Sequence, residues 1–222
     1  MNVLVFGATG MIGQGVLRDC LLDPDVGRVV TIGRTPSGAR HPKLREIAHR
    51  DLLHYGSIQN ELAGFDACFF CLGVSSAGMA EADYERVTYG ITLAAAEALS
   101  RLNPKLTFVY VSGAGADSSE RGRVMWARVK GKTENALLRL PFQAAYMFRP
   151  GVIRPLDGIR SRTASYRFLY AAAKPLLPVL AWAFPNYVLT TRQIGRAMLA
   201  VARRGAGKRV LESKDIRAVL QP

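Results

Sequence analysis

The sequence contains few of the residues that cross-link chains or hold metal ions. Its 222 residues include three cysteines and three histidines. An odd and sparse set of cysteines argues against a disulfide framework. Cys68 and Cys71 have a C-x-x-C spacing, but they fall within one apolar strand, Ala67 to Leu72, in which successive side chains point to opposite faces. Because the histidines also lack metal-ligand spacing, we expect buried packing for these two cysteines and no metal site.

A long uninterrupted apolar run is also absent. In the C-terminal apolar region the longest uncharged stretch, Pro175 to Thr191, has 17 residues and is interrupted by Pro178 and Pro185, whereas a membrane span needs ~20. The N-terminal apolar stretch has no basic leader and is soon broken by glycines, so we expect no signal peptide. These features predict a cytoplasmic protein, with peripheral attachment to a membrane surface as an alternative.

Acidic residues are scarce in the C-terminal part of the chain. The whole sequence has 30 Lys and Arg against 17 Asp and Glu, a net charge of +13. Between Asn135 and Leu211, thirteen basic residues are accompanied by a single acid, Asp157. Such a basic region is compatible with an anionic small-molecule substrate, an acidic membrane surface or nucleic acid, in that order, or with ordinary solvated charge. No recognised motif organises the charges for nucleic-acid binding, so that partner is the least favoured.

The most informative stretch is the N-terminus, where a strand leads into a glycine loop. Val3 to Phe6 are uniformly apolar, which is typical of a buried parallel strand. A G-x-x-G-x-x-G loop, Gly7 to Gly13, follows, and apolar residues then recur at helical spacing. In such loops the glycines permit a tight turn, close approach of a pyrophosphate and close packing of helix on strand. We therefore predict a nucleotide-binding site here.

The rest of the chain alternates strands with helices. Expected strands lie at 28–33, 44–49, 67–72, 106–111 and 143–148, with a last one near 209–211, and expected helices at 81–101, 124–140 and 192–203. This alternation predicts an α/β fold, a Rossmann-type doubly wound parallel sheet whose ligands bind at the carboxyl ends of the strands. The length suits a single domain, residues 1–222, with a small C-terminal substrate-pocket subregion.

Residues at the ends of the second and third strands predict the cofactor. Arg34 stands where an acid bonds the ribose 2′-hydroxyl of NAD, and an arginine there accommodates the 2′-phosphate of NADP. NADP is therefore favoured over NAD. Asp51, after the third strand, either caps the adenine amino group or forms a turn. The small-residue loop Gly73 to Gly78 is placed to cover a cofactor bound at the first glycine loop.

Several further motifs resemble one protein family. They are Gly7 to Gly13, Ile32-Gly33-Arg34, Arg50-Asp51-Leu52, Cys71-Leu72-Gly73, Val109 to Ser112, Val129-Lys130-Gly131 with Glu134, and Phe148 to Val152. Together they resemble an atypical short-chain dehydrogenase/reductase of the NAD(P)-binding epimerase/dehydratase-like group, over nearly the whole chain. The resemblance implies that the cofactor contacts Gly7, Thr9, Gly10, Met11, Ile12, Gly13, Arg34, Asp51, Leu52, Leu72, Gly73, Lys130, Pro150, Gly151 and Val152. It also implies that Ser112 and Lys130 are catalytic.

One position departs from the family pattern. Such enzymes use a serine and a Tyr-x-x-x-Lys motif, and here Trp126 occupies the tyrosine position four residues before Lys130. An indole donates a hydrogen bond but has no accessible ionisation, so Trp126 cannot replace the phenol as general acid. The sequence thus predicts either an NADP-dependent oxidoreductase on a small or lipid-like carbonyl or hydroxyl compound, with another proton donor, or a non-catalytic NADP-sensing or scaffold protein. Tyr84, Tyr89 or a water on Ser112 are alternative donors.

The segment 151–191 is expected to form a substrate-pocket or interface insertion. Its apolar and aromatic part, Phe168 to Leu189, predicts a lid over an apolar pocket or a surface for a homodimer. An interfacial helix on a membrane, flanked by basic residues, is the alternative for a peripheral reductase.

Overall fold

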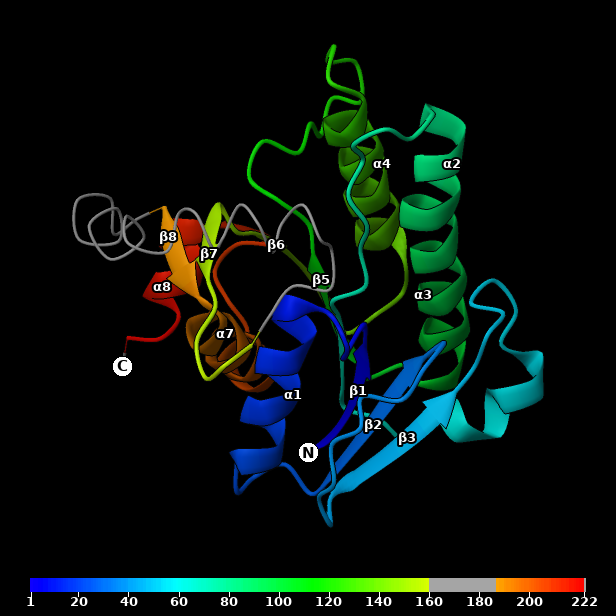
Figure 1. Ribbon diagram of the computed structural model, residues 1–222, viewed down its shortest axis with the longest axis vertical. Coiled ribbons are helices and arrows are strands. Elements are labelled where there is room, and N and C mark those ends of the chain that lie inside the picture. The colour runs from blue at the N-terminus through cyan, green and yellow to red at the C-terminus, as the bar shows by residue number, and fades with distance from the viewer. Residues whose placement is uncertain (160–186, 222) are drawn as a thin grey trace.

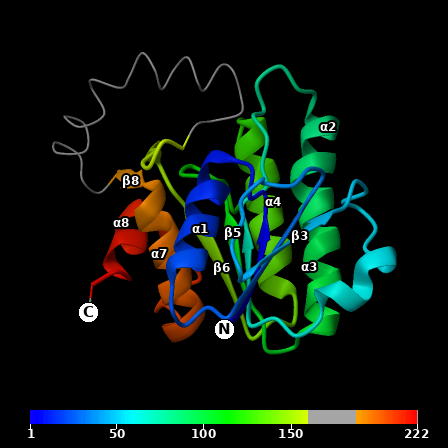
Figure 2. The same cartoon turned by 60° about the horizontal axis from the view of Figure 1, so that its bottom comes forward.

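The computed structural model describes residues 1–159 and 187–221, in which helices cover both faces of a parallel sheet (Figures 1 and 2). The main sheet has the order β3-β2-β1-β4-β5-β6-β9, with every neighbouring pair parallel. Its strands are β1 (Asn2–Phe6), β2 (Arg28–Gly33), β3 (Leu44–Ala48), β4 (Ala67–Phe70), β5 (Thr107–Val111), β6 (Ala144–Arg149) and β9 (Val210–Glu212). The predicted doubly wound fold is confirmed, and strand bounds differ from prediction by at most two residues.

The side chains of β1 show why its sequence is apolar throughout. Val3 and Val5 belong to a core cluster with α1 (Met11–Leu22) and α7 (Thr191–Arg204), whereas Leu4 and Phe6 belong to a second cluster with α3 (Ile91–Leu102). Figure 2 shows α1 and α7 on one side of the sheet and α3 and α4 (Met125–Arg139) on the other. A strand covered on both faces has no solvent side, so no position favours a polar residue.

The predicted helix 81–101 is continuous but contains a wider turn. It consists of α2 (Glu81–Glu85), the π-helical η2 (Arg86–Gly90) and α3. The helix ends at Leu102, and the side chain of the next residue, Asn103, accepts a hydrogen bond from the Phe65 amide (2.9 Å) and donates one to the Leu62 carbonyl (2.8 Å). Single π-helical turns within α-helices occur frequently at functional sites.

Four short elements were not predicted: η1 (Gly56–Leu62), β7 (Val152–Arg154), β8 (Val188–Thr190) and α8 (Ser213–Ala218). β7 and β8 pair with each other in a parallel two-stranded sheet, so the two ends of the segment 151–191 lie side by side. Each strand has three residues, which is too short to show a period in the sequence. The expected lid, interface or membrane helix within 160–186 lies outside the described residues. In the described parts of the chain, no helix has the length and apolar character to cross a membrane.

Candidate functional site

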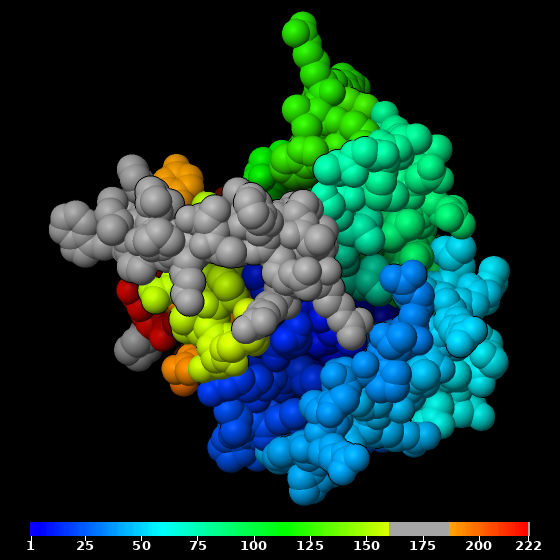
Figure 3. Space-filling view, viewed as in Figure 1, coloured from blue at the N-terminus to red at the C-terminus, as the bar shows by residue number. Residues whose placement is uncertain are grey.

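The carboxyl ends of the central strands surround a cavity of about 830 Å³. It lies where the chain order of the sheet reverses, between β1 and β4, which is the position where ligands bind in doubly wound folds. In Figure 3 the N-terminal segment (dark blue), the β2–β3 region (light blue) and the segment around α2 (teal) meet around this position. Of the residues predicted to contact cofactor or substrate, it is lined by Gly7, Thr9, Gly10, Met11, Ile12, Arg34, Asp51, Leu52, Leu72, Gly73, Ser112, Lys130, Pro150 and Gly151.

At two positions of the glycine loop there is no room for a side chain. Gly7 has a φ of +73°, and a Cβ on it would lie 2.6 Å from the Leu72 amide nitrogen of the neighbouring strand end. A Cβ on Gly13 would lie 2.0 Å from the Gly7 carbonyl oxygen. Gly13 does not line the cavity, and its glycine is explained by the close approach of α1 to the loop.

The loop backbone fits a phosphate group. Gly10 is the N-cap of α1 and provides no side-chain cap, so the first amide groups of the helix have no acceptor from a capping residue. There is open space next to both Gly10 and Gly73, because a Cβ on Gly73 would meet no described atom within 4 Å, and one on Gly10 only the Gly7 carbonyl oxygen at 3.3 Å. A helix N-terminus with unsatisfied N–H groups and space before it suits a pyrophosphate.

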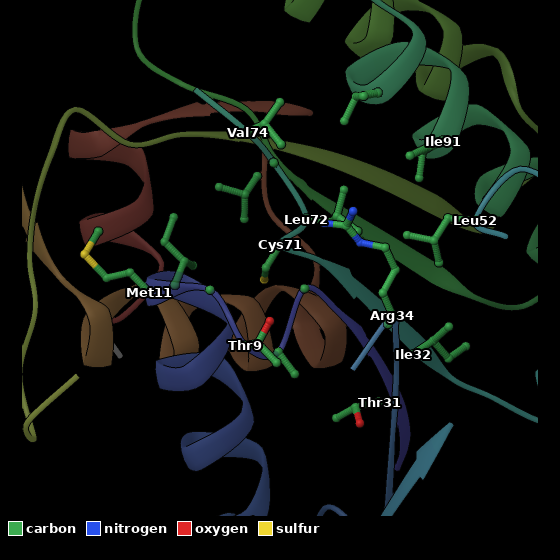
Figure 4. Close-up of a pocket in the computed structure, with 18 of the residues that line it drawn as sticks. Thr9, Met11, Thr31, Ile32, Arg34, Leu52, Cys71, Leu72, Val74 and Ile91 are labelled. Atoms are coloured by element: carbon green, nitrogen blue, oxygen red, sulfur yellow. The ribbon is translucent and has the colours of Figure 1, made fainter. Parts of the chain in front are cut away.

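Positive charge concentrates along the cavity. Figure 4 shows the Arg34 side chain extending from the end of β2 into the space between Leu52 and Leu72. Arg50 and Arg86 also line the cavity, and none of the three guanidinium groups makes a hydrogen bond or ion pair within the described residues. The sequence reasoning missed Arg50 and Arg86 as site residues. Arg86 lies in η2, whose place beside the cavity follows only from the packing of helices.

Asp51 and Glu46 are carboxylates near these arginines, and both have partners. Asp51 accepts hydrogen bonds from the Leu53 amide (3.1 Å) and His54 Nδ1 (2.9 Å), and these bonds lower its pKa. That geometry is the predicted turn, while the adenine contact remains a prediction. Glu46 accepts hydrogen bonds from the Ser37 amide (2.7 Å) and Thr31 Oγ1 (3.1 Å) and so fixes the loop that follows Arg34.

Ser112 and Lys130 form the other end of the cavity. Ser112 follows β5 and is 7% exposed, and its Oγ has no hydrogen-bond partner within the described residues. Lys130 on α4 donates to the Ser112 carbonyl (Nζ to O, 3.3 Å), and its Nζ lies 5.4 Å from the centre of the Tyr110 ring. Burial lowers the pKa of Lys130 to about 8, against the opposing charge of Glu134. A buried hydroxyl without a partner beside an ammonium group suits a bound oxygen atom.

A buried ion pair supports this end of the site. Glu134, one turn after Lys130, accepts two hydrogen bonds from Arg149 on β6: Nε to Oε1 at 2.9 Å and Nη2 to Oε2 at 2.5 Å. The Glu134 side chain is 1% exposed and that of Arg149 12%. Arg149 also donates to Ser118 Oγ (2.7 Å), in the loop before α4. The pair therefore fixes α4 against β6 directly before Pro150 and Gly151.

Trp126 and Val152 lie outside the described lining of the cavity. Trp126 is in the first turn of α4, where its ring approaches Gly115: a Cβ on that glycine would be 3.5 Å from Trp126 Cη2. Tyr84 is 2% exposed and Tyr89 lies under Lys132, whose Nζ is 4.7 Å from its ring centre. Neither alternative tyrosine lines the cavity.

Cys68 takes the packing role expected for both cysteines, whereas Cys71 is partly buried and lines the cavity. Cys68 is fully buried in β4, and burial raises the pKa of both Cys68 and Cys71. In the described part of the chain, no group of three or more histidine, cysteine or acidic residues is arranged to hold a metal ion.

The sheet order and the glycine loop at its reversal define a Rossmann-type α/β fold. Residues 3–121 match the NAD dependent epimerase/dehydratase family, and the chain belongs to that family. A solved relative in fold is the Bordetella bronchiseptica enzyme WbmF in complex with NAD+, with a TM-score of 0.68 at 16% identity, covering 98% of this chain and 76% of that one.

Curated relatives are fungal proteins. Protein FMP52-2, mitochondrial, of Scheffersomyces stipitis is 30% identical over 155 residues, 68% of this chain and 66% of that protein. Protein FMP52, mitochondrial, of Meyerozyma guilliermondii is 25% identical over 207 residues, 91% of this chain and 85% of that protein. These names contradict the cytoplasmic location predicted from the N-terminal sequence, and that prediction is wrong. It rested on the lack of a secretory signal, which does not distinguish the cytoplasm from an organelle.

Proposed function

We propose that the protein is an NADP-dependent oxidoreductase that acts on a small or lipid-like carbonyl or hydroxyl compound. The observation that carries the proposal is the cavity itself, with Arg34 at one end and Ser112 and Lys130 at the other. The neighbour WbmF is described as binding NAD+, but here the position after β2 is Arg34, which has no partner within the described residues. A guanidinium at that position suits a 2′-phosphate.

Each part of the cavity suits one part of the cofactor. The amides that begin α1 suit the pyrophosphate, Arg34 the 2′-phosphate, and Leu52 with Asp51 the adenine. Lys130 suits the hydroxyls of the nicotinamide ribose, and Ser112 Oγ a substrate oxygen. The bound cofactor supplies hydride chemistry, and the protein's residues bind and orient both molecules.

The cations favour an anionic substrate. Arg86 reaches the cavity from η2 and has no partner within the described residues, and the acid that lines the cavity, Asp51, is already hydrogen-bonded. A carbonyl compound with a carboxylate or phosphate would therefore gain a charge-assisted contact that a neutral analogue lacks.

Trp126 favours a second candidate, a protein that binds NADP and responds to it without turnover. Within the described residues no tyrosine lines the cavity, so the usual family proton donor is missing. The two candidates share cofactor binding and differ in catalysis.

Calorimetric titration of NADPH and NADH tests cofactor binding, which both candidate functions require. Wild type should bind NADPH more tightly, and Arg34→Ala should lose roughly ten- to a hundredfold in NADPH affinity, the equivalent of ~1.5–3 kcal/mol for a charge-assisted contact. Arg40→Ala, an exposed arginine of the following loop outside the cavity, is the matched control. Equal affinity of wild type for both cofactors would refute the NADP preference. Turnover of a carbonyl panel with NADPH then separates enzyme from sensor.

A further inference from the structure

Within the described residues, the reacting end of the cavity has one group able to move a proton. Lys130 and Ser112 line the cavity together, Lys130 Nζ lies 3.3 Å from the Ser112 carbonyl, and Ser112 Oγ has no partner within the described residues. We propose that Lys130 itself donates the proton to the substrate oxygen, in place of the phenol that position 126 lacks. This inference rests on the proposed reductase function and adds a catalytic role that the family pattern gives to another residue.

The other ionisable groups of the described lining are poor donors. Its arginines do not release protons at accessible pH. Asp51 has a 60% exposed side chain, and its hydrogen bonds lower its pKa, so it is a carboxylate at neutral pH. Burial raises the pKa of the Cys71 thiol, which opposes proton release. Tyr84 and Tyr89 do not line the cavity. Among the described lining residues, Lys130 both lies beside Ser112 and carries an ammonium group that can release a proton.

The surroundings of Lys130 make its ammonium group a stronger acid than that of an exposed lysine. Burial lowers its pKa to about 8 from an ordinary 10.5, and an efficient general acid has a pKa close to the working pH. From its own helix it faces Glu134, which favours the charged form but is itself bonded by Arg149. From β5 it faces the Tyr110 ring, whose hydroxyl pKa is raised by burial and by the nearby Tyr84 of α2. The Tyr110 phenol, whose pKa is raised, carries no charge near neutral pH.

The step balances without a further reactant. As the carbonyl carbon accepts a hydride from NADPH, one N–H bond of the Lys130 ammonium breaks and an O–H bond forms on the substrate oxygen. Ser112 Oγ–H donates a hydrogen bond to that oxygen and keeps its own proton. The carbonyl compound is reduced to an alcohol, NADPH is oxidised to NADP+, and the neutral amine regains its proton from water.

The decisive variant is Lys130→Arg, which keeps the positive charge and hydrogen-bond donors but cannot release a proton at neutral pH. We expect kcat for reduction to fall ~10²–10⁴-fold, the usual contribution of general acid catalysis, and to fall by more than any loss of NADPH affinity measured by calorimetry. Lys132→Arg on the same helix, paired with Glu85 and outside the cavity, is the matched control. Lys130→Gln provides a second variant, and thermal melting verifies that each variant is folded.

A direct titration provides a readout that needs no turnover. In protein labelled at lysine side chains, the NMR signal that Lys130→Arg removes should titrate near pH 8, and kcat for reduction should fall above that pH. Titration near 10.5, or Lys130→Arg with more than half of wild-type kcat, would overturn the role of Lys130 alone. Wild type that binds NADPH but reduces no carbonyl would overturn this role and favour the sensor, and wild type that binds no NADPH would overturn the proposed function itself.

Discussion

Removal of Arg149 should destabilise the protein far more than removal of a surface arginine. In Arg149→Met the aliphatic length is kept, but the 1% exposed Glu134 side chain loses two hydrogen bonds and its counter-charge. Leaving one partner of a buried pair alone costs ~3–5 kcal/mol. For a chain of this size 1 kcal/mol shifts Tm by about 2–4 °C, so we expect a fall of roughly 6–20 °C.

Urea unfolding followed by circular dichroism at pH 7 measures this loss. Arg45→Met is the matched control, because the Arg45–Glu61 pair has the same 2.5 Å separation but side chains that are 61% and 38% exposed. An exposed pair contributes at most ~1 kcal/mol. Adding Glu134→Leu to Arg149→Met should recover part of the loss, because no charge is then buried alone. Losses of similar size in Arg149→Met and Arg45→Met would refute the argument that burial makes the difference.

Two further predictions concern the cofactor cavity and the packing of α1 on α7. Gly73→Val places its side chain in the open cavity, so it should abolish the rise in Tm that NADPH causes while leaving the melting of the free protein within about 2 °C. In Gly27→Val the new side chain also meets no atom but lies outside the cavity, so NADPH should still raise Tm. If neither variant showed the rise, the placement of NADPH beside Gly73 would be contradicted. Asp19 is 7% exposed, and burial raises its pKa to about 6 despite the charge of Arg18. Because the folded state then binds this proton more tightly than the unfolded chain, stability is lost as pH rises from about 4 through 6. Asp19→Asn should therefore gain up to about 3 kcal/mol on wild type between pH 4 and 7 in urea unfolding, and a pH-independent difference would contradict this.

The strands were predictable because burial on both faces leaves a direct mark on the sequence. β2 has the predicted bounds, Arg28–Gly33, because its apolar run ends in a glycine where the chain turns. The carboxyl end of β4 was placed two residues too late, since Cys71 and Leu72 continue the apolar pattern after the ladder with β1 and β5 stops. Apolar pattern reports burial, whereas a strand also requires a hydrogen-bonded neighbour.

The cofactor end of the site was predictable for a different reason. There the requirements fall on the backbone, and only glycine meets them: Gly7 needs a positive φ, and Gly13 must let α1 approach the Gly7 carbonyl. Such positions are visible as residue types at fixed spacing. Arg86 was missed because η2 reaches the cavity through helix packing, which leaves no local pattern.

The reacting end could not be derived from the sequence, because its chemistry depends on burial and on charges brought together from distant segments. The motif places Lys130 four residues after Trp126, but the fall in the pKa of Lys130 comes from desolvation between α4 and β5. The opposing charge of Glu134 is moderated by Arg149, fifteen residues further along the chain. The motif identifies Lys130 as a cofactor ligand, but its pKa is lowered only once folding buries the side chain. Under the role proposed for Lys130, loss of a phenol at position 126 leaves an acid group at this end of the cavity.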